Sequence, residues 1–201
     1  MTKKTIFIVL FFSLVFAFAF YINGRNITGN VVYSSMDKDV LVVPVKAHII
    51  KESSGYYSSL RDEENIINLF KEVNRIWSQA GIYIEVNKIV VTETSPRAII
   101  DSLNSNSSEI YYHENYAQGK INIFFTKNLS GINGIALPHV DSALIADFTT
   151  VNDYRTTAHE IGHLLGLRHV QESNNLMAQG RNGEMLSESQ IITARKNALT
   201  Y

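Results

Sequence analysis

The sequence contains no cysteine among its 201 residues. This absence excludes disulfide bonds, iron–sulfur clusters, thiolate zinc sites and cysteine nucleophiles. The sequence also lacks an excess of either charge, because 18 basic residues nearly balance 19 acidic residues, so no overall positive charge is available to bind a nucleic-acid backbone. We therefore expect any bound metal ion to be held by histidine and carboxylate side chains, and we expect no nucleic-acid partner.

An apolar segment at the N-terminus differs from the rest of the chain. Two lysines precede a run from Ile6 to Ile22 in which only one serine and one tyrosine interrupt the apolar side chains. A positive start, an apolar stretch and a small residue at the expected cleavage point, Ala19, are typical of a secretory signal peptide. A helix of this length also nearly spans the hydrocarbon core of a membrane, so an uncleaved anchor stays open. Residues 1–22 are predicted to be a signal peptide or signal anchor, which makes the protein extracytoplasmic, either secreted or anchored in the membrane.

The remaining chain is predicted to be a linker followed by one folded domain. Residues 23–39 are rich in Asn, Gly, Ser and Thr and show little apolar periodicity, which is typical of a linker. Residues 40–201 are enough to bury about 70% of the surface that the unfolded chain would expose. We expect this domain to be a monomer.

Apolar periodicity predicts both helices and strands in this domain. Apolar residues recur at helical spacing over residues 61–80, and Gly81 then ends the predicted helix. Ser187 and Gln190 form a capping box at the start of a helix over residues 187–199. Pro44 favours an edge position or a bulge for the first strand. A short helix is expected over 96–103, and strands over 40–50, 82–91, 120–125 and 142–147.

The segment Thr156–His169, which reads TTAHEIGHLLGLRH, has the spacing of a zinc site. His159 and His163 are four residues apart, so on a helix they lie on one face and can bind one Zn²⁺. Glu160 directly follows the first histidine, where it can act on a zinc-bound water without ligating the ion. These residues predict a metal site that can activate water.

Gly166 supplies the turn that completes the predicted site. Glycine readily adopts the positive φ that ends a helix, so the chain can bring His169 back as a third ligand. Three protein ligands leave one position open on the ion, which is typical of a catalytic zinc site.

With this H-E-x-x-H-x-x-G-x-x-H motif, followed by Asn175-Leu176-Met177, the sequence resembles the metzincin zinc metallopeptidases and looks most like their compact matrixin-like branch. The resemblance implies an α+β, zincin-like fold with a mixed, twisted sheet of about five strands. It also implies two long helices, the second carrying the zinc motif, and a C-terminal helix. Met177 is implied to be the methionine of the Met-turn, which lies beneath the zinc-binding imidazoles. Gly134–Leu137 is implied to be an edge strand that pairs with substrate.

The residues and the resemblance together predict a zinc-dependent endopeptidase over residues 40–201. One catalytic Zn²⁺ would be held by His159, His163 and His169, and Glu160 would be the general base that hydrolyses peptide bonds of a protein or peptide substrate with a zinc-activated water. A structural Ca²⁺ or second Zn²⁺ is left open, and no other cofactor site is assigned.

Two other functions stay open at this point. The first is a catalytically silent binding module at the cell surface that uses the zinc fold as a scaffold. The second is a membrane-anchored interaction protein that presents an aromatic patch made of Tyr111, Tyr112, His113 and Tyr116.

Overall fold

The structure is a computed structural model, and it describes residues 39–103 and 115–201. The predicted leader, residues 1–22, and the predicted linker up to residue 38 lie outside the described residues, as do Tyr111, Tyr112 and His113 of the aromatic patch. Within the described ranges, the helices are all too short or too polar to cross a membrane.

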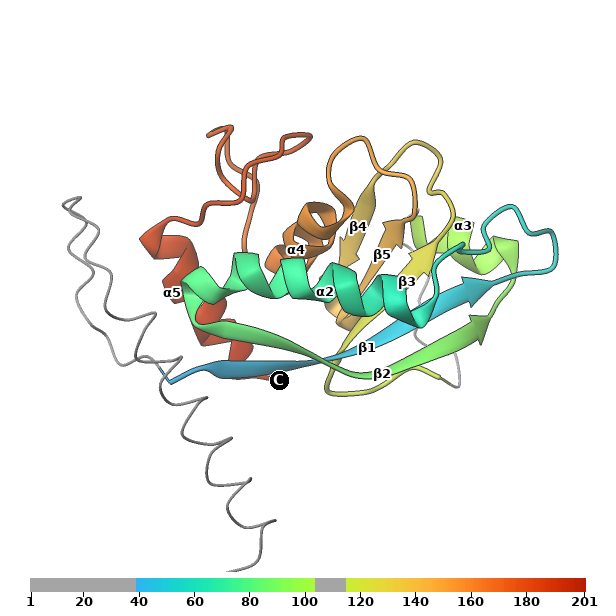
Figure 1. The fold of residues 1–201 in the computed structure, drawn as a ribbon, viewed down its shortest axis with the longest axis horizontal. Coiled ribbons are helices and arrows are strands. Elements are labelled where there is room, and N and C mark those ends of the chain that lie inside the picture. Colours follow the sequence, from blue (N-terminus) through green and yellow to red (C-terminus); the bar gives the residue numbers. More distant parts are fainter. Residues whose placement is uncertain (1–38, 104–114) are drawn as a thin grey trace, which may run out of the picture. The chain divides into compact units, whose positions relative to one another are not determined.

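Five strands form one mixed sheet in the order β2-β1-β3-β5-β4. Strands β2, β1, β3 and β5 run parallel to one another, and β4 pairs antiparallel with β5 at one edge (Figure 1). The predicted mixed sheet of five strands is therefore confirmed. The strands are β1 (Leu41–Lys51), β2 (Ile82–Glu93), β3 (Ile121–Thr126), β4 (Gly134–Leu137) and β5 (Ser142–Ala146).

Local sequence signals define where the helices begin and end. Helix α2 starts at a capping box, in which Asp62 accepts a hydrogen bond from the Asn65 N–H, and the turn after it ends at Gly81 with φ of 62°. Helix α5 starts at the capping box that Ser187 and Gln190 were predicted to form. The helices are α2 (Glu63–Trp77), α3 (Pro96–Leu103), α4 (Asp153–Leu164) and α5 (Glu188–Ala198), with short 3₁₀ turns η1 (Ser78–Ala80) and η2 (Pro138–Val140).

Apolar side chains cover both faces of the sheet. On one face, alternate residues of the strands, such as Ile123 and Ile145, pack against α2, α4 and α5. On the other face, Phe124 and Leu144 pack with Ile99 of α3 and with the loops. Because side chains alternate along a strand, a strand that is covered on both faces is buried at every position, as β3 and β5 are, and most of their residues are apolar. Helices α2 and α4, which cover the same face of the sheet, also pack on each other.

The prediction for Pro44 is half right. Strand β1 lies between β2 and β3, so it is not an edge strand. Pairing with β3 begins only at Val45, however, and the register with β2 shifts between Val45 and Lys46. Pro44 therefore lies where β1 has a single partner strand and directly before a bulge, which is where the missing N–H costs least.

Candidate metal centre and cleft

Helix α4 carries the first half of the predicted metal site. It begins at Asp153, packs against α2, β4 and β5, and holds His159, Glu160 and His163 in its second half. His159 and Glu160 are 5% and 6% exposed. The helix therefore fixes these side chains between the sheet and the surface.

The three predicted histidine ligands meet at one point. The Nε2 atoms of His159 and His163 are 3.2 Å apart, and each lies 3.1 Å from the Nε2 atom of His169. Two nitrogen ligands on a tetrahedral Zn²⁺, with bonds of about 2.0–2.1 Å, are about 3.3 Å apart, so the triangle has the size that zinc requires. These histidines are the only set of three or more candidate ligand side chains brought together in the described part of the chain.

Backbone carbonyls determine which nitrogen of each ring carries the proton. Nδ1 of His159 lies 2.8 Å from the carbonyl oxygen of Leu176, and Nδ1 of His163 lies 2.9 Å from that of Leu167. A carbonyl can only accept, so both Nδ1 atoms donate and both Nε2 atoms present a lone pair to the triangle. Burial lowers the pKa of His159 to about 4 and also lowers that of His163, which favours the neutral, ligating form.

The turn at Gly166 brings His169 to the other two histidines, as predicted. Gly166 has φ of 82°, its N–H donates to the His163 carbonyl, and the Leu167 N–H donates to the Gly162 carbonyl. These two bonds form a Schellman motif, which ends α4 in an ordered way. The side chain of Asn197 on α5 then donates to the carbonyl of Leu165 over 2.9 Å, so α5 supports the turn.

Met177 packs beneath the histidine-bearing helix. Its side chain is fully buried, and a Cβ placed on Gly162 would lie 2.6 Å from its sulfur atom. The Met177 N–H donates to the Asn175 side chain over 2.8 Å. The structure thus places Met177 against the segment of α4 between His159 and His163, where the predicted Met-turn lies.

Glu160 is held in an apolar environment next to strand β4. Burial raises the pKa of its carboxyl to about 7, although the backbone N–H of Ala136 on β4 donates to it and Arg155 lies nearby. A Cβ on Gly134 would lie 2.9 Å from Cγ of Glu160, so the absence of a side chain at residue 134 makes room for this carboxylate. The predicted edge strand and the predicted base are therefore in contact.

Arg155 was not predicted from the sequence. It lies one turn before His159 on α4, is 2% exposed, and donates through Nη2 to the carbonyls of Leu176 and Ala178. Its Nε donates to the carbonyl of Gly183 over 3.2 Å. Because Leu176 also accepts from His159, the guanidinium links the Met177 turn to the ligand helix. One feature of the sequence singles it out: Arg155 is the only charged residue in the segment from residue 154 to residue 159, which leads into the histidine motif.

These residues open onto one cleft of about 770 Å³. Its lining includes Gly134–Ala136 of β4, several residues of α4, and residues 166–169 and 179–180. The cleft also reaches Arg155 and Arg168. The three histidines and Glu160 thus line a single surface groove that runs along an open strand edge.

The sequence matches one family model, that of the matrixins, over residues 112–191. This range contains all of the residues assigned to the site: the three histidines, Glu160 and Met177. No match was found among curated protein sequences.

The fold is similar to those of solved metallopeptidases. Metalloproteinase-II from Bacteroides fragilis aligns with 18% identity and a TM-score of 0.50. The alignment covers 88% of this chain but only 59% of that protein. Mirolysin from Tannerella forsythia, solved in complex with a cleaved peptide, aligns with 19% identity and a TM-score of 0.50. This alignment covers 75% of our chain and 72% of mirolysin.

Archaemetzincin from Methanopyrus kandleri aligns with 11% identity and a TM-score of 0.55 over 81% of this chain and 98% of its own. At these identities the solved structures establish a shared fold. The matrixin model matches the segment that carries the histidine motif, and the fold is similar to those of these metallopeptidases.

Proposed function

We propose that this chain is an exported endopeptidase in which His159, His163 and His169 hold the zinc ion and Glu160 is the general base. The observation that carries the proposal is the triangle of Nε2 atoms, 3.1–3.2 Å apart, in the same cleft as the Glu160 carboxylate. Three neutral imidazoles are a donor set that suits Zn²⁺ and leaves a ligand position free.

The residues of the cleft have distinct roles in this proposal. When bound, Zn²⁺ lowers the pKa of a water molecule and polarises the carbonyl of the scissile peptide bond. Glu160 takes a proton from the water that attacks the carbonyl carbon, and it passes this proton to the leaving nitrogen as the C–N bond breaks. Strand β4 pairs only with β5 among the described strands, so its other edge can hydrogen-bond an extended substrate.

Substitution of Glu160 by alanine tests the role of the base. The E160A variant should bind zinc as the wild type does, because Glu160 is not a ligand, and should hydrolyse an unfolded protein several orders of magnitude more slowly. Zinc content and the rate of substrate cleavage, measured on the same preparation with and without a chelator, check both statements. An E160A variant as active as the wild type would exclude this role.

The same assay separates the endopeptidase from the silent binding module. A purified wild-type protein that holds zinc and cleaves none of a mixed peptide library would favour the module. Chelator-sensitive cleavage, with internal peptide bonds mapped by mass spectrometry, supports the endopeptidase.

Export is proposed from the sequence of residues 1–22. The full chain, expressed in bacterial cells, should be found outside the cytoplasm. N-terminal sequencing of the recovered protein distinguishes cleavage after Ala19 from retention as an anchor. A full-length protein recovered only from the cytoplasmic fraction would contradict export.

A further inference from the structure

A buried cation that forms no ion pair with any described residue lines the cleft. Arg155 is 2% exposed and lines the cleft, but its hydrogen bonds go to the backbone carbonyls of Leu176, Ala178 and Gly183. Glu160 and Glu184 influence it electrostatically, yet among the described residues neither carboxylate forms an ion pair with Arg155, and Glu184 pairs with Arg75 instead. Neutral carbonyls offset the burial of a full charge only in part, so an anion in the cleft would be stabilised by Arg155.

The exposed rim of the cleft carries a second cation. Arg168 directly precedes the ligand His169, is exposed, and lines the same cleft. The only carboxylate that lines the cleft is that of Glu160, which is 6% exposed. A substrate side chain that enters the cleft therefore meets the exposed guanidinium of Arg168, while the charges of Arg155 and Glu160 at the cleft lining are both buried.

We propose that the cleft selects peptides with an acidic side chain next to the scissile bond, with the exposed Arg168 as the cation that binds this side chain and the buried Arg155 as a second positive charge that favours it at longer range. Guanidinium groups bind carboxylates through charge-assisted, often paired hydrogen bonds, and they discriminate against amides of the same shape. The proposal rests on the peptidase function proposed above, and it adds the class of substrate.

Matched peptides test the preference directly. Three series carry Glu, Gln or Lys at each position flanking one cleavable bond and are otherwise identical. For at least one position, kcat/KM should be about tenfold higher with Glu than with Gln, and lower still with Lys. Added salt should reduce the Glu:Gln ratio, because the exposed guanidinium is screened.

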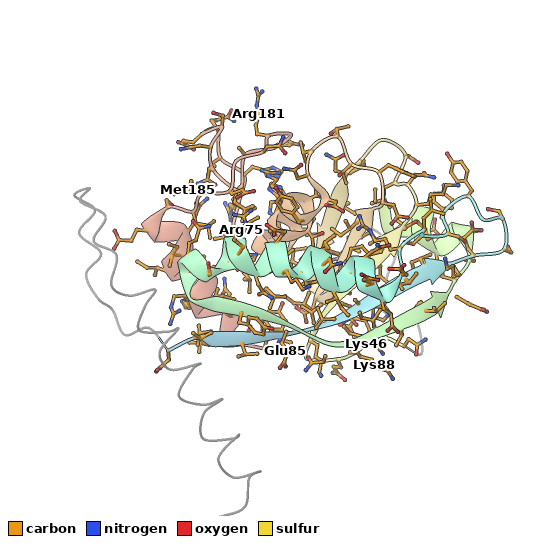
Figure 2. The ribbon with its side chains drawn as sticks, viewed as in Figure 1. Lys46, Arg75, Glu85, Lys88, Arg181 and Met185 are labelled. Carbon is orange, nitrogen blue, oxygen red and sulfur yellow. The ribbon has the colours of Figure 1, made fainter. Side chains whose placement is uncertain are left out.

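A variant of the rim residue tests the assignment. In Arg168→Gln the Glu:Gln ratio should fall severalfold and stay above one, because Arg155 remains. Arg181→Gln is the matched control, since Figure 2 shows the Arg181 side chain extending outward from its loop and it does not line this cleft. Its ratio should equal that of the wild type.

Each outcome has one meaning. A Glu:Gln ratio of one or less at every position in the wild type overturns the proposal while leaving the peptidase intact. Equal losses in Arg168→Gln and Arg181→Gln would attribute the preference to general surface charge and overturn the assignment, as would an unchanged ratio in Arg168→Gln. A wild type that cleaves none of the peptides would instead contradict the proposed function.

Discussion

At the residue scale, the carbonyl oxygen of Leu176 has an unusual double role. It accepts hydrogen bonds from Nδ1 of His159 and from Nη2 of Arg155. The next residue, Met177, packs against Gly162 on the same helix. One short segment therefore sets the ring orientation of His159, anchors the buried Arg155 and packs against the helix that carries both. Partners of this kind usually matter for metal affinity almost as much as the ligands do.

Removal of one imidazole should abolish stable zinc binding. His163→Ala leaves two ligands, which cannot hold the ion against dialysis, so zinc content should fall from about one ion per chain to near zero. Elemental analysis of the dialysed protein measures it. His139→Ala, which removes an exposed histidine outside the triangle, should keep its zinc. Unchanged zinc in His163→Ala would contradict the ligand assignment.

A methyl group at Gly162 should strain the contact with Met177. The added Cβ would lie 2.6 Å from the sulfur of a fully buried side chain, so Gly162→Ala should lose about 1–3 kcal/mol of unfolding free energy despite the better helix propensity of alanine. Chemical denaturation of the metal-free protein measures the loss. When Gly162→Ala is made in a protein that already carries Met177→Ala, the loss of unfolding free energy should be much smaller, because the sulfur that the new methyl group would meet is absent. Additive losses in the double variant would argue against a direct contact.

The meeting of the three histidines could be predicted from the sequence because their spacing is local. His159, His163 and Gly166 lie within eight residues, and helix geometry alone places the two histidines on one face. The hydrogen-bond partners of Arg155 could not be predicted, because its three acceptors follow it by 21 to 28 residues. A charge next to an apolar helix face says nothing of which distant carbonyls will surround it.

At the scale of elements, the strongest local signals correspond to the ends of helices. The capping box of Ser187 and Gln190 and the stop at Gly81 occur as the sequence predicts, because each needs only a few neighbouring residues. The position of Pro44 in the sheet was predicted less well. Whether a strand lies at an edge depends on which other strands flank it, and this is decided by residues far along the chain.

The turn at the end of α4 should be sensitive to any side chain. Gly166→Ala adds a Cβ at φ of 82° and only 2.2 Å from Nδ2 of Asn197, so it should cost the strain of a left-handed residue plus the Asn197 hydrogen bond, about 2–4 kcal/mol together. Thermal unfolding and zinc affinity should both decrease.

Gly119 provides the matched control. It has φ of 70° and nothing lies within 4 Å of its Cβ position, so Gly119→Ala carries the backbone strain alone. The difference between the two variants isolates the contact with α5. Equal losses would mean that α5 does not support the turn.

At the scale of the whole molecule, the site lies where two distant parts of the chain meet. Gly134 and Ala136 on β4 contact Glu160 on α4, and the order of the strands, with β4 after β5 at the edge, makes this contact geometrically available. The motif predicts the helix, and the resemblance implies the strand. The contact between them depends on the packing of α4 on the sheet, which no local pattern encodes.

Burial of the histidines should make the metal-free protein acid-sensitive. The pKa of His159 is about 4 in the folded protein and about 6.5 in an unfolded chain, so between these values the unfolded chain binds a proton that the folded one does not. Stability is therefore complete above about pH 6.5 and declines as the pH falls towards 4, by at most about 3 kcal/mol from this residue. Denaturation of the chelator-treated protein across this range measures the decline.

Replacement of His159 separates its contribution from that of the carboxylates. His159→Gln removes the titrating group but keeps a side-chain N–H for the Leu176 carbonyl, so its stability profile between pH 4 and 6.5 should be flatter. His139→Gln should follow the wild type, because His139 is exposed. A wild-type slope in His159→Gln would assign the acid sensitivity to other groups.

The packing of Met177 against Gly162 also has a chemical consequence. Methionine sulfur is readily oxidised to the polar sulfoxide, which disrupts an apolar core. The Met177 side chain is completely buried, whereas Met185, labelled in Figure 2, is 59% exposed and offers oxidants an accessible sulfur. In a chain without cysteine, the sulfur that packs beneath the histidine-bearing helix is thus shielded by the helix that it supports. For a protein that we propose to work outside the cytoplasm, we expect oxidants to reach the Met177 sulfur far more slowly than that of Met185.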